Sequence, residues 1–410
     1  MFQVVVHTPD VVGDRMAGPG IRAWHLASEL AKHFETTLIA KSEVAGSEVA
    51  RDPLPVARAV SPEPNSPGNG QRTTGNLEPN RPGNGQRSTG NLPHNLTILE
   101  HASSSARKAL RDADVLIGQP ARGFGKRHPR QRIVYDLFDP TVLELRELYG
   151  NAPSPRQRVH LAAEWWRLSA ALRRADLLIC AAAKQREFYE RLQSSDTRWI
   201  EVPFGIDPGE TRVCAKPQDN VVVWGGGVWE WLDPATAVEA IVRVNELGVR
   251  AKLLFLGRAR PNRDLIDRRR DNRFEALLAR GGEHVSANEQ WVPYRERLAW
   301  LRAGKIAIML HRRTAEADYS IRTRLFDAIA AGIPVIASRG GFAADLVEAE
   351  GLGIVVPPGD CGAVVDAIRR LLTDDGLHSA SVESLERIRP RYAWEVVTRP
   401  LVSAIKQWQT

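Results

Sequence analysis

The chain has 410 residues, of which 43% are hydrophobic and 26% are charged. A single hydrophobic core stops growing near about 250–300 residues, so more than one domain is expected. The composition excludes collagen-like, coiled-coil and fully disordered chains. The formal net charge of +7 is small for this length and indicates only that anionic partners are tolerated.

Targeting and redox features favour an intracellular protein. Cys180, Cys214 and Cys361 lie far apart and form no CxxC pair, which excludes a four-thiolate zinc site and indicates a reducing compartment. The start, MFQVVVHTPD, lacks the basic region and cleavage site of a secretory signal. No apolar run approaches the roughly 18–20 residues that cross a bilayer. We expect a cytoplasmic protein, soluble or peripheral at the inner membrane face, with no metal site.

Short apolar runs alternate with segments of helical period along the whole chain. Residues 2–7, 21–34 and 36–40 read as strand, helix and strand, and the alternation restarts at 220–224 with a helix at 234–247. Nearly continuous apolar strands are typical of parallel sheets covered by helices on both faces. The pattern therefore predicts an α/β fold with two doubly wound domains. Further strands are expected at 114–118, 132–136, 176–181, 199–203, 252–257, 306–310, 334–338 and 353–357.

The boundaries follow from composition. We expect an N-terminal Rossmann-like domain over 1–203, a C-terminal one over 204–390, and a final helix in 391–410. This helix would either cover the second domain or cross back to the first. The hinge is expected between Val202 and Asn220, in a segment rich in Pro, Gly and polar residues. Within 61–95, 19 of 35 residues are Pro, Gly or Asn, and a 15-residue unit occurs twice. This stretch reads as a surface insertion without an assigned function.

In each expected domain, a glycine-containing turn follows the first strand. Gly18 and Gly20 open a helix, where glycine lets a backbone approach a ligand and the helix N-terminus attracts an anion; a tight turn without a ligand is the alternative. The third glycine of the dinucleotide fingerprint is absent. In VVWGGGVWEWLDP, at 222–234, Gly226 and Gly227 stand where a doubly wound sheet opens its ligand crevice. Trp229 would stack on a base or sugar, or pack between domains.

The segment 315–346 carries the densest charge pattern. A helix beginning near Arg322, with Ser320 as its N-cap, would place Arg324 and Asp327 within a turn of its positive end. Paired arginines suit a diphosphate, and a carboxylate one turn deeper suits a ribose diol. The alternative is a solvated basic helix start.

Several of these segments together resemble retaining glycosyltransferases of family 4. They are Glu316–Ser338 with Gly340-Gly341, GPGIRAWHLASEL, ADLLICAAAKQREFY, VPFGID and PRYAWEVV. The resemblance implies the GT-B architecture, in which two Rossmann-like domains face a central cleft. It also implies transfer of a sugar from a nucleotide-diphosphate sugar to an acceptor hydroxyl, with retention and without a required metal or tightly bound cofactor. The acceptor would be a glycan, a lipid-linked molecule or a small molecule, as in surface polysaccharide, glycolipid or natural-product synthesis.

The chain departs from the family pattern at its charged positions. Asp327 stands at the second glutamate of the Glu-x7-Glu signature and Tyr319 at the first, so Glu316 is assigned the contacts to the transferred sugar. Gly227 and Leu232 replace the usual Arg and Lys that neutralise the diphosphate. Loss of both cations would raise the barrier by several kcal/mol unless other cations compensate. The expected replacements are Arg322, Arg324 and then Arg258.

Three further interpretations concern the acceptor and the alternatives. Asp136 or Asp139, at the carboxyl end of the strand at 132–136, would order an acceptor hydroxyl or contact the donor sugar. An Asp before Pro140 is also ordinary turn chemistry. The arginines of 258–273 would contact an anionic bilayer or form a solvated, internally paired helix. A GT-B protein that binds a nucleotide sugar or glycan without turnover is the second candidate function. Nucleic-acid binding is the least supported, because the basic residues lack interleaved aromatics.

Overall fold

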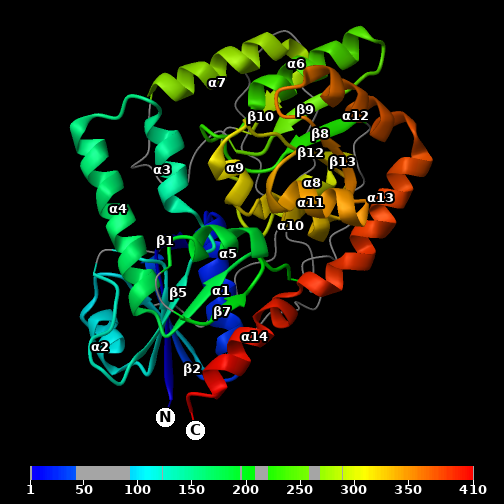
Figure 1. Ribbon diagram of the computed structural model, residues 1–410. Coiled ribbons are helices and arrows are strands. Elements are labelled where there is room, and N and C mark those ends of the chain that lie inside the picture. The colour runs from blue at the N-terminus through cyan, green and yellow to red at the C-terminus, as the bar shows by residue number, and fades with distance from the viewer. Residues whose placement is uncertain are drawn as a thin grey trace, which may run out of the picture.

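The computed structural model (Figure 1) describes residues 2–42, 93–121, 123–193, 196–207, 220–257, 268–288 and 290–409. Most of the predicted insertion, the centre of the predicted hinge and Arg258 lie outside these residues. Within them the chain forms two α/β domains, each built on one parallel sheet. The predicted fold class is confirmed.

The described part of the first domain has a seven-stranded sheet in the order β3-β2-β1-β4-β5-β6-β7. Every neighbouring pair is parallel. The order reverses between β1 and β4, so the carboxyl ends of these strands form a crevice. The strands are β1 (Gln3–Val12), β2 (Glu35–Ser42), β3 (Leu96–Glu100), β4 (Val115–Gly118), β5 (Arg132–Asp136), β6 (Leu177–Cys180) and β7 (Trp199–Glu201).

Helices cover both faces of this sheet. The helix α4 begins with a capping box, in which Ser154 accepts from the Gln157 amide and the Gln157 side chain accepts from the Ser154 amide. Pro155 occupies its first turn, where a missing amide hydrogen has no cost. The helices are α1 (Gly18–Leu30), α2 (Ser104–Asp112), α3 (Thr141–Tyr149), α4 (Pro155–Arg174) and α5 (Ala183–Glu190).

The second domain has a six-stranded parallel sheet, counted over the described residues, in the order β10-β9-β8-β11-β12-β13. Strands β8, β11 and β12 are buried throughout. The strands are β8 (Val221–Trp224), β9 (Lys252–Phe255), β10 (Val285–Ala287), β11 (Ile306–Met309), β12 (Val335–Ser338) and β13 (Gly353–Val356). The helices are α6 (Pro234–Glu246), α7 (Arg268–Gly281), α8 (Arg297–Arg302), α9 (Ala315–Tyr319), α10 (Thr323–Ala331), α11 (Gly341–Glu350), α12 (Cys361–Thr373) and α13 (Asp375–Ile388).

The chain passes between the domains at two adjacent places. After β7 it enters the second domain, and after α13 it returns through η4 (Arg389–Tyr392) to α14 (Trp394–Lys406), which lies against α1 of the first domain (Figure 1). The Ile206 amide donates to the Tyr392 carbonyl, and the Trp394 amide donates to the Ile206 carbonyl. A Cβ at Gly205 would lie 2.3 Å from Trp394 Cδ2, so this crossing requires glycine. Among the described residues, none of the helices combines the length and the apolar character of a membrane span.

Candidate active site

The two arginines of the Arg-Thr-Arg segment lie at the start of α10, but Ser320 does not cap that helix. The short helix α9 is capped by Thr314 and has Ser320 as its C-cap residue, and Ile321 separates it from α10. Arg322 is the N-cap residue of α10. The predicted capping role of Ser320 is therefore wrong, because the chain completes a separate turn first. Its hydroxyl is buried and has no hydrogen-bond partner within the described part of the chain.

Arg322 forms a buried, bidentate ion pair with Glu316. Its two terminal nitrogens lie 2.7 Å from the two carboxylate oxygens, and the Glu316 side chain is 0% exposed. Both oxygens of Glu316 are thus engaged by Arg322, rather than directed at a sugar as the resemblance implied. The Arg322 Nε is buried and has no acceptor among the described residues. Glu316 fixes this guanidinium and leaves that N–H group to point elsewhere.

Arg324 has no carboxylate partner in the described structure. Its Nη2 donates to the Gly227 carbonyl, and its guanidinium carbon lies 5.4 Å from the ring centroid of Trp224. Its buried Nη1 has no acceptor among the residues described. Burial and then the neighbouring Arg322 lower the pKa of Arg324 to about 9. A buried cation without a counter-charge is unfavourable. An anion bound next to the Arg324 guanidinium would neutralise its charge.

The glycine turn after β8 lies next to the Arg324 guanidinium. Gly226 has a φ of +81°, a conformation that glycine adopts without strain. A Cβ there would lie 3.8 Å from the Arg324 Nε. Trp229 stacks on Trp231 at 5.5 Å with an interplanar angle of 2°. The pair packs on the apolar core of the second domain.

The first domain meets the second at the start of α1. A Cβ on Gly18 would lie 3.3 Å from Thr323 Cγ2, so the N-termini of α1 and α10 face each other. Gly20 is needed for packing inside the first domain, because a Cβ there would lie 2.2 Å from the Val11 carbonyl oxygen. In the second domain, Asp327 pairs with Arg297 at 3.0 Å. One Asp327 oxygen thus already has a cationic partner.

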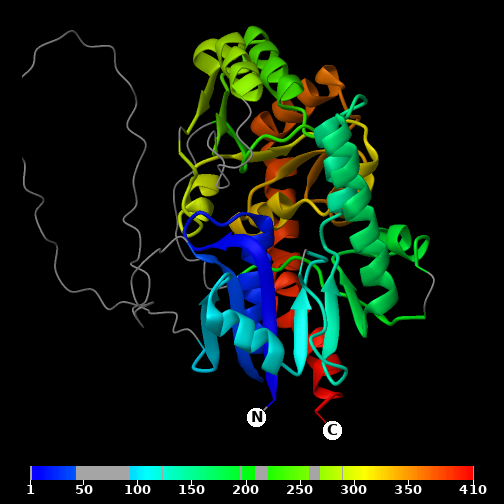
Figure 2. The same ribbon diagram turned by 90° about the vertical axis from the view of Figure 1, so that its left-hand side faces the viewer.

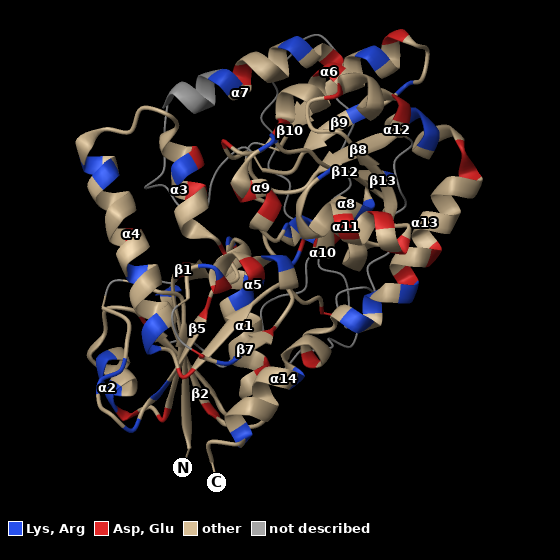
Figure 3. Ribbon diagram, in the orientation of Figure 1, with Lys and Arg blue, Asp and Glu red and all other residues tan. Residues whose placement is uncertain are grey.

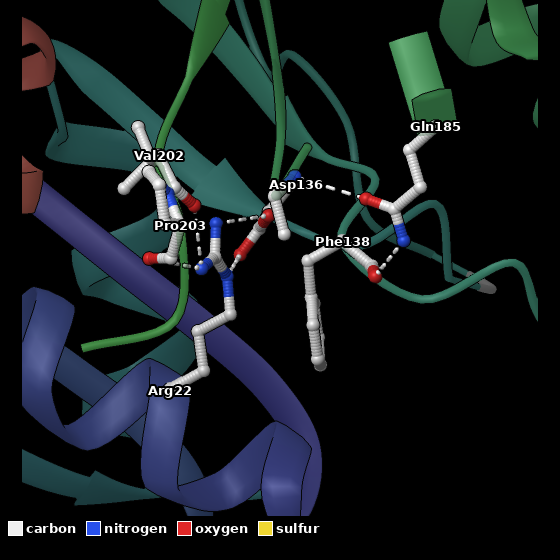
Figure 4. A network of polar contacts seen from close by, with 7 residues as sticks. Arg22, Asp136, Phe138, Gln185, Val202 and Pro203 are labelled. Atoms are coloured by element: carbon white, nitrogen blue, oxygen red, sulfur yellow. Dashed lines mark hydrogen bonds and ion pairs between the residues drawn. The ribbon is translucent and has the colours of Figure 1, made fainter. Parts of the chain in front are cut away.

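Asp136 lies at the carboxyl end of β5, inside a buried network (Figure 4). Arg22 of α1 donates to both its carboxylate oxygens, at 2.7 Å and 3.0 Å. The Arg22 Nη1 also donates to the carbonyls of Val202 and Pro203, at 2.9 Å and 3.3 Å. Gln185 connects the neighbouring loop by donating to the Phe138 carbonyl. Asp136 therefore fixes, through Arg22, the segment where the chain leaves the first domain.

A carboxyl pair that the sequence did not single out as a pair lies nearby. Asp139 follows β5, and its carboxyl group interacts electrostatically with that of Glu144 in α3. Burial raises the pKa of Asp139 to about 6 and raises that of Glu144 well above its usual value. Glu316 of the second domain raises both pKa values further, and Arg322 opposes it. Of the two, only Asp139 carried a sequence signal, the Asp-Pro turn after a strand.

A cavity of about 280 Å³ opens beside this pair in the first domain. Its wall is formed by Pro9 of β1, the loops after β4 and β5, the start of α3, one side of α4 and Tyr189 of α5. Asp136, Asp139 and Thr141 contribute polar groups, as do Glu164 and Arg167. In the described ranges, no cluster of three or more His, Cys, Asp or Glu side chains is arranged to hold a metal ion.

Comparison with known proteins gives a family match over part of the chain and the GT-B architecture for the fold. Residues 219–374 match the family described as "Glycosyl transferases group 1". No curated protein matches the chain. Among solved structures, sucrose-phosphate synthase from Thermosynechococcus elongatus has a TM-score of 0.65 at 17% identity, with 99% of both chains covered. WaaG, a glycosyltransferase involved in lipopolysaccharide biosynthesis, has a TM-score of 0.64 at 15% identity, again with 99% of both chains covered.

A third similar structure contains a nucleotide sugar. Anabaena HepE in complex with UDP-glucose has a TM-score of 0.64 at 12% identity, covering 99% of this chain and 100% of HepE. At these identities the likeness establishes the fold, which is GT-B.

Proposed function

We propose that this protein is a glycosyltransferase that moves a sugar from a nucleotide-diphosphate sugar to an acceptor hydroxyl. The observation that carries the proposal is Arg324, a cation with a buried, unpartnered N–H group beside the Gly226 turn. It lies in the region that matches the group 1 glycosyl transferases. The finer features that the family resemblance implies are retention of configuration and independence of metal. A cytoplasmic site of action is part of the proposal as well.

The donor diphosphate is proposed to lie between the start of α10 and the turn after β8. Arg324 would bind it with Nη1, Arg322 with Nε, and Ser320 with its hydroxyl, the three groups that have no partner in the described structure. Negative charge grows on the leaving phosphate during glycosyl transfer. Hydrogen-bond donors that are held in position before the reaction stabilise such charge best. Glu316 acts as a positioning residue, because its carboxylate holds the Arg322 side chain.

The remaining candidate residues are proposed to surround this diphosphate site. Gly226, Gly227 and Trp229 would line the nucleotide, and Asp327 would offer its second oxygen to the ribose. Gly18 would approach the donor from the first domain. Arg258 is proposed as a further cation near the same site. The acceptor, a glycan, lipid-linked molecule or small molecule, would enter the cavity beside Asp139.

Binding without turnover is the second candidate function. It is favoured by the positions of the family's missing cations, since Gly227 is part of the turn and Leu232 is 4% exposed in the apolar core. Neither position provides charge, so the reaction depends on the arginines of α10.

Calorimetry with UDP, GDP and ADP, followed by donor turnover assays, tests the proposal. Arg324→Ala should weaken binding of the preferred nucleotide about 10-fold to 150-fold, because a hydrogen bond to a charged group contributes roughly 1.5–3 kcal/mol. The control is Arg370→Ala, an exposed arginine of α12, which should bind as the parent does. Equal affinity in Arg324→Ala and the parent would refute the assignment. Tight binding without diphosphate release from any donor would favour the binding protein.

A further inference from the structure

The outer side of α4 carries an unusual apolar surface. Val159 is 71% exposed and Trp166 is 64% exposed, the two highest values among the exposed large hydrophobic side chains of the described residues. With Ala162, which is also exposed, they are spaced three and four residues apart and therefore share one helix face. The opposite face is buried against the first domain, through Leu168, Ala171 and Leu172.

Basic residues surround this apolar stripe. Helix α4 contains five arginines and one acidic residue, Glu164, which pairs with Arg167. The other four arginines are exposed, and no ion pair joins them to a carboxylate of the described structure. They lie near the two ends of the helix, where Figure 3 shows blue segments on either side of a tan middle. These four are Arg156, Arg158, Arg173 and Arg174.

The same helix forms part of the wall of the cavity in the first domain. Glu164, Arg167 and Leu168 line that cavity, whereas Val159 and Trp166 face away from it. Helix α4 stands at the periphery of the molecule in both views (Figures 1 and 2). A surface that bound the outer side of α4 would thus lie one helix diameter, about 10 Å, from the proposed acceptor cavity.

We propose that the outer face of α4 docks on an anionic lipid bilayer. Tryptophan is favoured at the boundary between headgroups and acyl chains, and arginines are attracted to anionic headgroups. A basic helix with an exposed aromatic stripe is typical of interfacial binding. If the protein is the glycosyltransferase proposed above, membrane docking implies that its acceptor is held by the membrane. This consequence rests on the proposed function. This docking surface on α4 is separate from the basic stretch at 258–273, most of whose side chains lie outside the described residues.

Charge favours a bilayer over a protein partner or a second copy of the chain. The stripe has only two large apolar side chains, and around it lie four arginines that no described carboxylate pairs with. A stable protein interface has a larger and less charged centre. A second copy would also bring the same cations face to face. An anionic surface satisfies all four at once.

Vesicle co-sedimentation of the full-length protein tests the proposal. The parent should bind vesicles of phosphatidylglycerol and phosphatidylcholine, bind pure phosphatidylcholine weakly, and lose binding in high salt. Trp166→Ser with Val159→Ser, and separately Arg156→Gln with Arg173→Gln, should weaken partitioning at least 10-fold. Each near-surface arginine is expected to contribute roughly fivefold. Leu247→Ser, which removes an exposed leucine (58%) from the second domain, should bind as the parent does.

Nucleotide affinity and melting temperature are measured on every variant. Unchanged values show that the variants are folded and keep failure of membrane docking distinct from failure of the proposed function. The proposal is overturned if the parent does not bind the anionic vesicles, or if Leu247→Ser loses as much binding as the α4 variants. It is also overturned if light scattering shows a dimer that Trp166→Ser converts to a monomer.

Discussion

Replacing Asp136 tests whether this carboxylate acts on the substrate or on the structure. The side chains of Arg22 and Asp136 are 1% and 7% exposed, and they make two hydrogen bonds to each other. Removing one partner of a buried ion pair leaves the other charge uncompensated and costs about 3–5 kcal/mol. For a protein of this size each kcal/mol shifts the melting temperature by roughly 2–4 °C. Asp136→Asn should therefore melt on the order of 6–20 °C lower.

The double variant sharpens the test. Arg22→Met with Asp136→Leu removes both charges and should cost less than the sum of the single changes, because neither charge is then buried alone. Some loss remains, since the carbonyls of Val202 and Pro203 lose their donor. Lys32→Ala, in the turn that follows α1, is the control. It breaks an exposed pair with Glu29 and should cost less than about 1 kcal/mol.

Differential scanning calorimetry gives the melting temperatures, and nucleotide titration gives the affinity. We expect Asp136→Asn to keep its nucleotide affinity within about threefold, which is less than 1 kcal/mol, at a temperature where the variant is folded. The reasoning is refuted if Asp136→Asn melts with the parent and turnover falls 100-fold. Asp136 would then contact the substrate or the reacting atoms.

Two other predictions concern the glycines of α1 and the carboxyl pair. Gly20→Ala should destabilise the protein by about 1–3 kcal/mol, because the new Cβ would lie 2.2 Å from a backbone oxygen. In Gly18→Ala the new Cβ would lie 3.3 Å from a methyl carbon, so this variant should mainly change turnover. Equal melting temperatures of the two variants would contradict this prediction. Because Asp139 has its pKa raised to about 6 when folded, its contribution to stability is present below about pH 4 and is lost as the pH rises through 6. Asp139→Asn should therefore gain stability relative to the parent as the pH rises between those values. A constant difference in melting temperature across that range would contradict it.

The sequence predicted the central strands better than the edge strands. Every predicted central strand has a counterpart, and the helix expected at 234–247 is α6, Pro234–Glu246. The alternation missed β3 and β10, which lie at the outer edges of their sheets. An edge strand is only partly buried, as β3 is, so it needs no continuous apolar run. Hydrophobic pattern therefore carries less information there, although it did locate the opposite edge strands, β7 and β13.

The position of each candidate site residue along the chain was legible, but the partner of each charge was not. The glycine turns follow β1 and β8, and the two arginines begin α10, because such features depend on residues close in sequence. The ion pairs of Asp136 with Arg22 and of Asp327 with Arg297 join residues 114 and 30 positions apart. Whether a carboxylate is free for a substrate or neutralised by an arginine depends on which helix packs opposite it. The tertiary structure alone decided that, and it left Arg324 as the cation of the Arg-Thr-Arg segment without a carboxylate partner in the described chain.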